Sequence, residues 1–153
     1  MQMNSRFSLA VHILCLLASA PEERLTSEYI ATSIGTNAVV IRRLLAKLRR
    51  FGLVTSKSAG GGGWMLAHPA ATITLDQVRQ AMAEGEAAKI HRNAPHPACS
   101  VGKGVRQALI DLYHQADVAL DRELAGISVA QILASVLKQE TTKHHSRSLF
   151  LRS

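Results

Sequence analysis

Residues 27–66, SEYIATSIGTNAVVIRRLLAKLRRFGLVTSKSAGGGGWML, contain two helical patterns followed by two strand-like runs. The first pattern begins at Thr26 or Ser27, either of which can cap a helix, and a turn is expected at Gly35. The residues expected on the apolar side of this first helix are Tyr29, Ile30 and Ile34. The stretch therefore starts with a short helix and a tight turn that leads into a second helix.

The second helix is expected to begin after Asn37, which can cap it, and to end at Gly52. Its apolar residues recur at the i, i+3, i+4, i+7 spacing of one buried stripe. They are Ile41, Leu44, Leu45 and Leu48, and the cations on the other side are Arg42, Arg43, Lys47, Arg49 and Arg50. A charge run is often only a solvated face, but this helix has no carboxylate for i,i+4 ion pairs. The helix and turn before it favour an anionic partner outside the protein.

Beyond Gly52, the runs LVTSKS and WMLA flank a glycine-rich tip and predict a β-hairpin. A glycine-rich loop can also cradle phosphates, but Trp64 and Met65 stand where a P-loop has Lys and Ser or Thr. A hairpin after two such helices is typical of a winged helix-turn-helix. The expected fold class is therefore mainly α with a small β-wing.

The order of these pieces resembles the Rrf2 family of bacterial winged-helix transcription regulators, in its YwnA-like branch, from Asn4 to about Leu137. The most specific matches are the helix start NAVVIRRL, the GLVTS before the wing, the Gly-Gly-aromatic-x-Leu exit at residues 62–66, and ITLDQV after it. The resemblance implies a sequence-specific DNA-binding regulator of transcription, most often a homodimeric repressor, whose C-terminal region senses a redox or small-molecule signal.

Several members of that family hold an iron–sulfur cluster on three cysteines in the loop before their long helix. Here only Cys99 lies in this region, so no chain can supply the thiolate set. No iron–sulfur cluster, other cofactor or metal site is therefore expected. The wing also departs from the family, because Ser58 and Ala59 stand where many relatives have arginine and glycine, which weakens the case for minor-groove readout.

An apolar helix is expected before this stretch, capped by Asn4 or Ser5 and reaching about Ala18. The segment imitates a signal peptide, but His12 interrupts its apolar run, which is too short to span a bilayer. We therefore interpret it as a core helix and expect no membrane contact.

The formal charge of +7 is unevenly distributed along the chain. Residues 1–68 hold eight Lys/Arg and three Asp/Glu, a net charge of +5, whereas residues 69–140 carry −1 and the last thirteen residues +3. This placement suits a polyanion that meets the helix-turn-helix. The two cysteines, Cys15 and Cys99, do not make a disulfide framework and fit a reducing, cytoplasmic location.

Four segments are expected along the chain: a winged helix-turn-helix domain at 1–84, a sensor loop at 85–100, dimerisation helices at 101–140 and a basic, disordered tail at 141–153. The first ends in a helix from Thr74 to about Ala83, with Gln77 in the reciprocal capping position. A further short helix is expected after Ser128.

A long C-terminal dimerisation helix is expected from Val101, with apolar residues at helical spacing through Leu120. The resemblance implies that it crosses to a partner chain, although a core within one chain would leave the same pattern. The residues expected at the dimer interface are Val105, Leu109, Leu112, Ala116 and Leu120. A homodimer suits double-stranded DNA with an inverted-repeat operator.

The DNA contacts are expected at the start of the second helix, along its basic side and on the wing. Asn37, Val39 and Arg42 are spaced to face one groove, with Arg42 the first choice as guanine reader and Arg43 the second. Contacts mainly to phosphates are expected from Arg6, Lys47, Arg49, Arg50 and Lys57. The remaining expected DNA contacts are Ser27, Gly61 and Gly62.

Cys99 is a candidate redox sensor, because free N–H groups and the positive end of the dipole at a helix start stabilise a thiolate. Such a cysteine could equally fill a capping position. Control by a protein partner is the alternative for a regulator. A small cysteine-dependent enzyme would need a base near Cys99, and His96 is close in sequence, but no oriented triad can be read.

Overall fold

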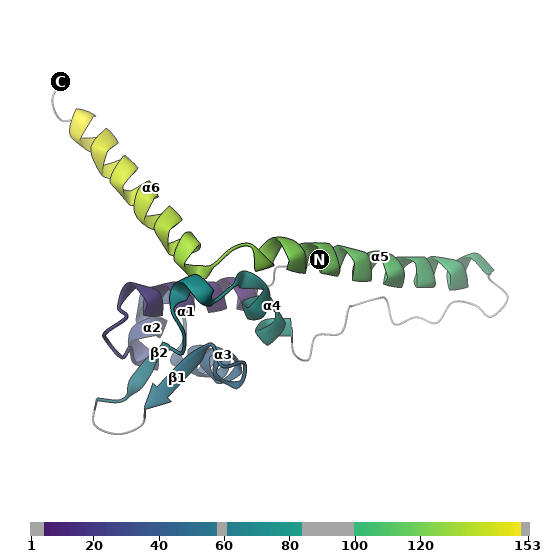
Figure 1. The fold of residues 1–153 in the computed structure, drawn as a ribbon, viewed down its shortest axis with the longest axis horizontal. Coiled ribbons are helices and arrows are strands. Elements are labelled where there is room, and N and C mark those ends of the chain that lie inside the picture. The colour runs from purple at the N-terminus through teal and green to yellow at the C-terminus, as the bar shows by residue number, and fades with distance from the viewer. Residues whose placement is uncertain (1–4, 58–60, 84–99, 151–153) are drawn as a thin grey trace.

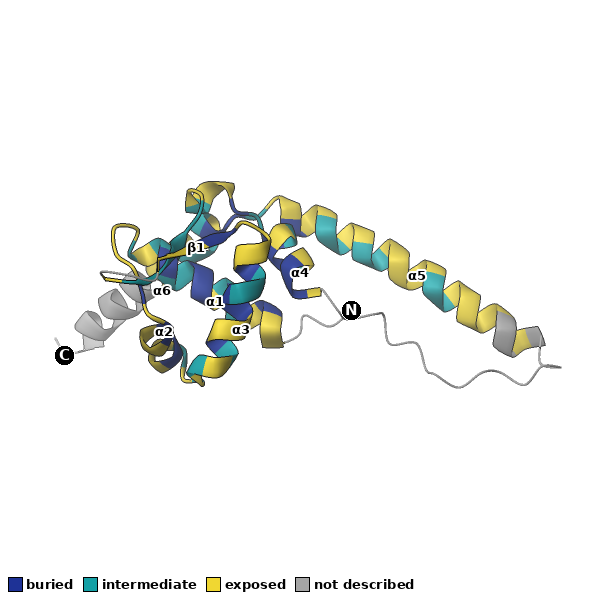
Figure 2. Cartoon of the chain, turned by 90° about the horizontal axis from the view of Figure 1, so that it is seen from below, coloured by how far each residue is buried: buried dark blue, intermediate teal, exposed yellow. Residues whose placement is uncertain are grey.

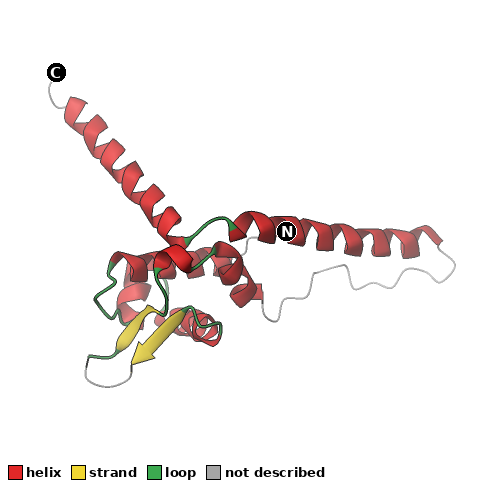
Figure 3. Cartoon of the chain, in the orientation of Figure 1, coloured by secondary structure: helices red, strands yellow, loops and turns green. Residues whose placement is uncertain are grey.

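In a computed structural model, the protein is mainly helical with one small antiparallel sheet, which confirms the expected fold class (Figure 3). The structure describes residues 5–57, 61–83 and 100–150. The elements in chain order are α1 (Ser5–Ser19), α2 (Ser27–Ile34), α3 (Ala38–Arg50), β1 (Val54–Lys57), β2 (Gly63–Leu66), the 3-10 helix η1 (Ala70–Thr72), α4 (Leu75–Ala83), α5 (Ser100–Ala125) and α6 (Val129–Phe150).

Helix α1 lies at the centre of the winged domain, with α2, α3 and the sheet on one side and the roots of α5 and α6 on the other (Figure 1). Its interpretation as a core helix is confirmed, since five of its apolar side chains are buried. They are Phe7, Ala10, Ile13, Leu14 and Leu17. The surface that carries α3 and the wing thus faces away from the surface from which α5 and α6 leave.

The turn between α2 and α3 is set by local hydrogen bonds of the residues expected from the sequence. Thr26 Oγ1 accepts from the N–H of Tyr29 at 3.1 Å, and Asn37 Oδ1 accepts from the N–H of Val39 at 2.6 Å. Gly35 ends α2 at a φ of 76°, a left-handed conformation that favours glycine. Tyr29 differs from the prediction, because it is 56% exposed while the next residue, Ile30, is the one buried.

The stripe predicted on α3 is confirmed, since Ile41, Leu44, Leu45 and Leu48 are all buried. The helix closes with the N–H of Leu53 donating to the carbonyl of Leu48 at 2.9 Å, which places Gly52 in the left-handed turn expected at a helix end. Four buried side chains at this spacing hold one side of α3 against the core and leave the other side to solvent.

The wing pairs β1 with β2 from Val54 opposite Leu66 to Lys57 opposite Gly63. On its other side β2 forms a bridge to Leu25, two residues before α2: Trp64 donates to the carbonyl of Leu25 at 2.9 Å and accepts from the N–H of Leu25 at 3.0 Å. A Cβ on Gly63 would lie 3.0 Å from the carbonyl oxygen of Leu25. The absence of a side chain there is what lets the wing lie this close to the helix-turn-helix.

The connection between α5 and α6 is joined by backbone hydrogen bonds to the start of α4. Leu75 donates to the carbonyl of Ile127 and Val129 donates to the carbonyl of Ile73, each at 2.9 Å. In the predicted capping box of α4, Gln77 accepts from the N–H of Thr74 at 3.1 Å, but the Thr74 hydroxyl bonds Asp76 instead. That box is therefore only half formed.

A complete capping box begins α6. Gln131 accepts from the N–H of Ser128 at 2.7 Å, and the Ser128 hydroxyl accepts from the N–H of Gln131 at 3.2 Å. The helix is longer than predicted, because it continues to Phe150 through most of the segment expected to be disordered. The sequence offers a reason, since no glycine or proline follows Gly126 to stop it.

Helix α5 projects away from the winged domain and is mostly exposed along its length (Figure 2). It has 26 residues and begins at Ser100, so it extends beyond both ends of the helix expected over 101–120. The expected sensor loop lies outside the described residues except for Ser100. Among the described residues, the C-terminal part of α5 is fastened to the domain, through Leu124 in the core and through ion pairs to α4.

Candidate nucleic-acid interface

The outer side of α3 presents the residues expected to meet DNA. At about 100° per residue, Val39, Arg43 and Arg50 lie opposite the buried stripe, and Arg42 lies on the flank. Val39 is 48% exposed. Asn37 uses its amide oxygen to cap the helix and keeps its NH₂ group to donate. The structure therefore places the start of α3, cations included, on the surface.

Arg42 is bound by a carboxylate from the neighbouring helix. Its Nη2 donates to Oε1 of Glu28, in the first turn of α2, and the two side chains are 54% and 63% exposed. A hydrogen bond from its own backbone and then the bond from Arg42 hold the pKa of the Glu28 carboxyl below its usual value. The ion pair thus links the two helices at the exposed front of the turn, which sequence spacing alone did not indicate.

Arg49 connects the end of α3 to the wing. Its Nη1 donates to the hydroxyl of Ser56 at 3.3 Å, and its guanidinium carbon lies 5.8 Å from the ring centre of Trp64. Ser56 and Trp64 face each other across β1 and β2, so one guanidinium contacts both strands. The sequence suggested a phosphate contact for Arg49, whereas the structure adds a packing role within the protein.

Ser27 differs from the prediction, because only 7% of it is exposed and its hydroxyl has little surface to offer DNA. The remaining predicted contacts lie at several places around α3. Arg6 is exposed in the first turn of α1, Lys47 is half-buried, and Lys57 ends β1 at the wing. Gly61, with a φ of 83°, and Gly62 lead into β2. The structure brings the α3 and wing residues together on one surface.

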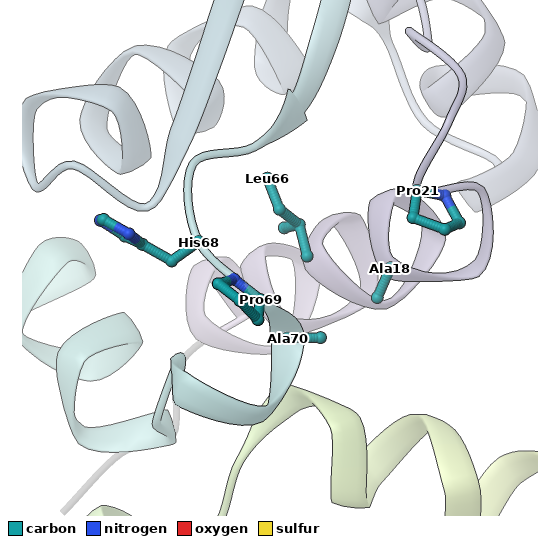
Figure 4. A pocket seen from close by; sticks show the side chains of 6 residues that line it. All are labelled: Ala18, Pro21, Leu66, His68, Pro69 and Ala70. Atoms are coloured by element: carbon teal, nitrogen blue, oxygen red, sulfur yellow. The ribbon is translucent and has the colours of Figure 1, made fainter.

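A hollow beside the end of α1, in the described part of the chain, is lined mostly by apolar side chains. Its volume is about 160 Å³, and the residues that line it are Ala18, Pro21, Leu66, His68, Pro69 and Ala70 (Figure 4). His68 is its one titratable residue, and the ring is turned away from Leu66 and Ala18. Among these same described residues, no three His, Cys, Asp or Glu side chains gather to hold a metal, and no helix is long and apolar enough to cross a membrane.

The two cysteines lie in different parts of the chain. Cys15 is half-buried in α1, and burial raises the pKa of its thiol, which makes the reactive thiolate scarcer. Cys99 lies outside the described residues and directly precedes the first residue of α5. We therefore expect the Cys15 thiol to be poorly reactive.

Two helices joined by a tight turn, a two-stranded wing and a basic outer side of the second helix define a winged helix-turn-helix regulator. Residues 3–135 match the Rrf2 family, described as "Iron-dependent Transcriptional regulator". The protein belongs to the Rrf2 family and is a regulator of transcription, not an enzyme.

Three similar proteins share most of the chain. YwnA of Bacillus subtilis (strain 168), named as an HTH-type transcriptional regulator, is 34% identical over 131 residues, which are 86% of this chain and 96% of YwnA. A crystal structure of a protein described as DNA-binding is 33% identical, with a TM-score of 0.69 over 84% of this chain and 99% of that chain. Oxidized CymR of Staphylococcus aureus is 18% identical, with a TM-score of 0.63 over 87% and 96%, and so shares the fold.

The family is described as iron-dependent, and the cysteines of this chain decide whether it could hold an iron–sulfur cluster. The chain has two cysteines in all, and one of them, Cys15, packs against the core of the winged domain. The residues present therefore do not fit an iron–sulfur cluster held by three cysteines of one chain. No step of the function proposed below passes through iron.

The contacts of Arg49 predict the effect of Arg49→Lys. Lysine keeps the charge but loses the planar group that stacks on Trp64 and bonds Ser56. We expect a loss of about 0.5 to 1 kcal/mol in the free energy of unfolding and a changed emission spectrum of Trp64, the one tryptophan of the chain. Arg43→Lys, on the same helix and exposed, should leave both unchanged. Equal thermal melts and spectra for the two variants would show that Arg49 does not hold the wing.

Proposed function

We propose that this protein is a homodimeric repressor that places α3 of each protomer in the major groove of an inverted-repeat operator. The observation that carries the proposal is the division of its surface. Cations of α3 and the wing lie on one side of α1, and the long helix α5, with its apolar stripe, leaves from the other (Figure 1). A protein of this shape can bind DNA with one surface and a second copy with the other.

The DNA-binding half of the proposal rests on the burial of α3. Because its apolar stripe is in the core, the side chains of Val39, Arg42 and Arg43 at its exposed start can reach base edges. Cations further along α3 and on the wing, among them Arg50 and Lys57, flank that position and suit phosphates. Base contacts would then give specificity, and phosphate contacts most of the salt-dependent affinity.

The dimer half of the proposal rests on apolar surface that the single chain leaves uncovered. Val105 is 49% and Leu112 56% exposed, and both lie on one stripe of α5. The other members of that stripe, Leu109, Ala116 and Leu120, are only half-buried. A helix of 26 residues is about 39 Å long, and a run of apolar side chains along it favours a partner of matching shape. The same stripe on a second copy is such a partner.

The signal that the regulator senses is assigned to the residue before α5. We propose that Cys99 responds to oxidants, because α5 begins at the next residue, and free N–H groups at a helix start stabilise a thiolate. A thiol of this kind reacts through sulfenic acid to a disulfide or mixed disulfide. CymR of Staphylococcus aureus has been solved in an oxidized form. Control by a protein partner remains the alternative mechanism.

The central test is selection of duplexes from a random library by the purified protein, followed by binding at two salt concentrations. We expect an inverted-repeat consensus. Arg42→Ala should relax the preference at one base pair per half-site, by about 1 to 3 kcal/mol. Arg50→Ala should weaken all duplexes alike and lower the salt slope by about one unit. If Arg43→Ala relaxes the preference and Arg42→Ala does not, Arg43 is the base reader; no consensus at all would refute the function.

The dimer is tested by placing a charge on the exposed stripe of α5. Leu112→Glu should give a monomer in sedimentation at micromolar concentration and abolish tight binding to the inverted repeat, because a buried carboxylate would lack a partner. His114→Glu is the matched control, since His114 is exposed on the opposite side of the same helix. The proposal fails if the wild-type protein sediments as a monomer, or if both variants stay dimeric.

The sensing role is tested by treating the wild type, Cys99→Ser and Cys15→Ser with peroxide and measuring operator affinity. We expect the wild type and Cys15→Ser to lose affinity on oxidation and Cys99→Ser to keep it, since only Cys99 is proposed to react. Addition of a thiol reductant should restore the lost affinity. Equal losses in all three proteins, or none, would mean that the signal enters elsewhere.

A further inference from the structure

Glu28 occupies a position where a carboxylate works against DNA binding. It is the one acidic residue between Glu23 and Asp76, a stretch that contains α2, α3 and the wing. Its side chain is 63% exposed on the front of the helix-turn-helix, close to where phosphates would lie. A negative charge there repels a polyanion. Its presence calls for a role that offsets this cost.

The ion pair of Glu28 does not supply that role through the stability of the fold. The partner of Glu28 is Arg42, and more than half of each side chain is exposed. Ion pairs between exposed groups contribute little to folding, because solvent screens them and two long side chains must be ordered. The α2–α3 pair is already held by the buried side chains of Ile30, Ile41 and Leu45. The effect of the pair is therefore to be sought in what Arg42 does.

The geometry leaves Arg42 able to bind a base while Glu28 holds it. The bond to Glu28 uses one N–H of Nη2, and a guanidinium has five N–H donors. Two of the remaining four can donate to O6 and N7 of a guanine. Arg42 also lies on the flank of α3 beside α2, so without a partner its long side chain would be free to turn toward phosphates. Glu28 restricts that freedom.

We propose that Glu28 is a specificity-determining residue that positions Arg42 for a base edge and disfavours its use on the phosphate backbone. The inference rests on the proposed function, in which Arg42 reads a base. Its two effects act in the same direction: a fixed guanidinium discriminates better between bases, and a carboxylate beside it weakens binding to any duplex regardless of sequence. Glu28 thus raises the ratio of specific to non-specific affinity, not the affinity itself.

The test compares duplexes selected by the wild-type protein with a scrambled duplex of equal length and composition. Glu28→Gln removes the charge, so its affinity for the scrambled duplex should rise several-fold. Its preference at the base pair read by Arg42 should fall by about fivefold or more, the lower end of what one bidentate contact gives. Glu23→Gln removes the same charge from the exposed connection before α2 and should leave that preference unchanged.

Two further variants separate positioning from charge. Glu28→Asp keeps the charge but shortens its reach by one methylene, so the base preference should fall while affinity for the scrambled duplex stays near that of the wild type. Combining Glu28→Gln with Arg42→Ala should cost no more preference than Arg42→Ala alone, because both act through one contact. Thermal melts of all variants should shift only slightly from the wild type, because Glu28 contributes no more than one exposed carboxylate at the start of α2.

Three outcomes separate the proposed role of Glu28 from the DNA-binding function on which it rests. If the wild type selects a consensus and Glu28→Gln keeps the same consensus and the same ratio of affinities, Glu28 has no part in specificity while the DNA-binding function stands. If preference falls equally in Glu23→Gln, the effect belongs to net charge and the inference is overturned. If the wild type selects no consensus, the proposed function itself has failed.

Discussion

The burial of one stripe of α3 is the constraint on which the rest of this structure depends. Four apolar side chains of α3 face the core: Ile41, Leu44, Leu45 and Leu48. Because a helix has 3.6 residues per turn, their burial decides which other side chains of α3 face solvent. Removing one such side chain typically costs about 2 to 5 kcal/mol, a large part of the stability of a small domain. The cationic surface is therefore a consequence of packing, and the same residues that stabilise the domain orient its binding side.

Much of the fold could be predicted from the sequence because its signals are local. The caps at Thr26 and Asn37, the turn at Gly35 and the stripe on α3 each depend on residues within about one or two turns of each other. The unpredicted features join residues far apart in the chain: Glu28 with Arg42, Arg49 with Trp64, and Leu25 with Trp64. Residue type could indicate which Lys and Arg side chains belong to the candidate site. It could not indicate which of them also form ion pairs or ring contacts with other residues of the protein. The burial of Ser27 was missed for the same reason, since the surroundings of a residue decide its burial. The length of α6 was missed although that segment contains no glycine or proline to end the helix.

The base of α5 is attached to the winged domain at points that constrain its direction. Arg79 of α4 donates to Asp121 at 2.6 Å and to Asp117 at 3.3 Å, residues one turn apart on α5. The bond to Asp121, aided by Asp117, raises the pKa of Arg79 above its usual value. Backbone hydrogen bonds from Leu75 and Val129 hold the following connection. Because Arg79 is only partly exposed, solvent screens its ion pairs less than the pair between Glu28 and Arg42. They are therefore better suited to fix the direction of α5 where it joins the winged domain.

The close approach of Gly63 to Leu25 determines whether the protein or the DNA would change shape when the two bind. With the β2 backbone against Leu25, and Leu25 only two residues before α2, the wing cannot swing without moving the first helix of the helix-turn-helix. Arg49 adds a second tie from the last turn of α3. These contacts therefore fix the distance between the wing and α3. If this distance does not match the local width of the groove, the duplex has to bend or twist. The free energy of that deformation varies with base sequence, even at base steps that no side chain touches.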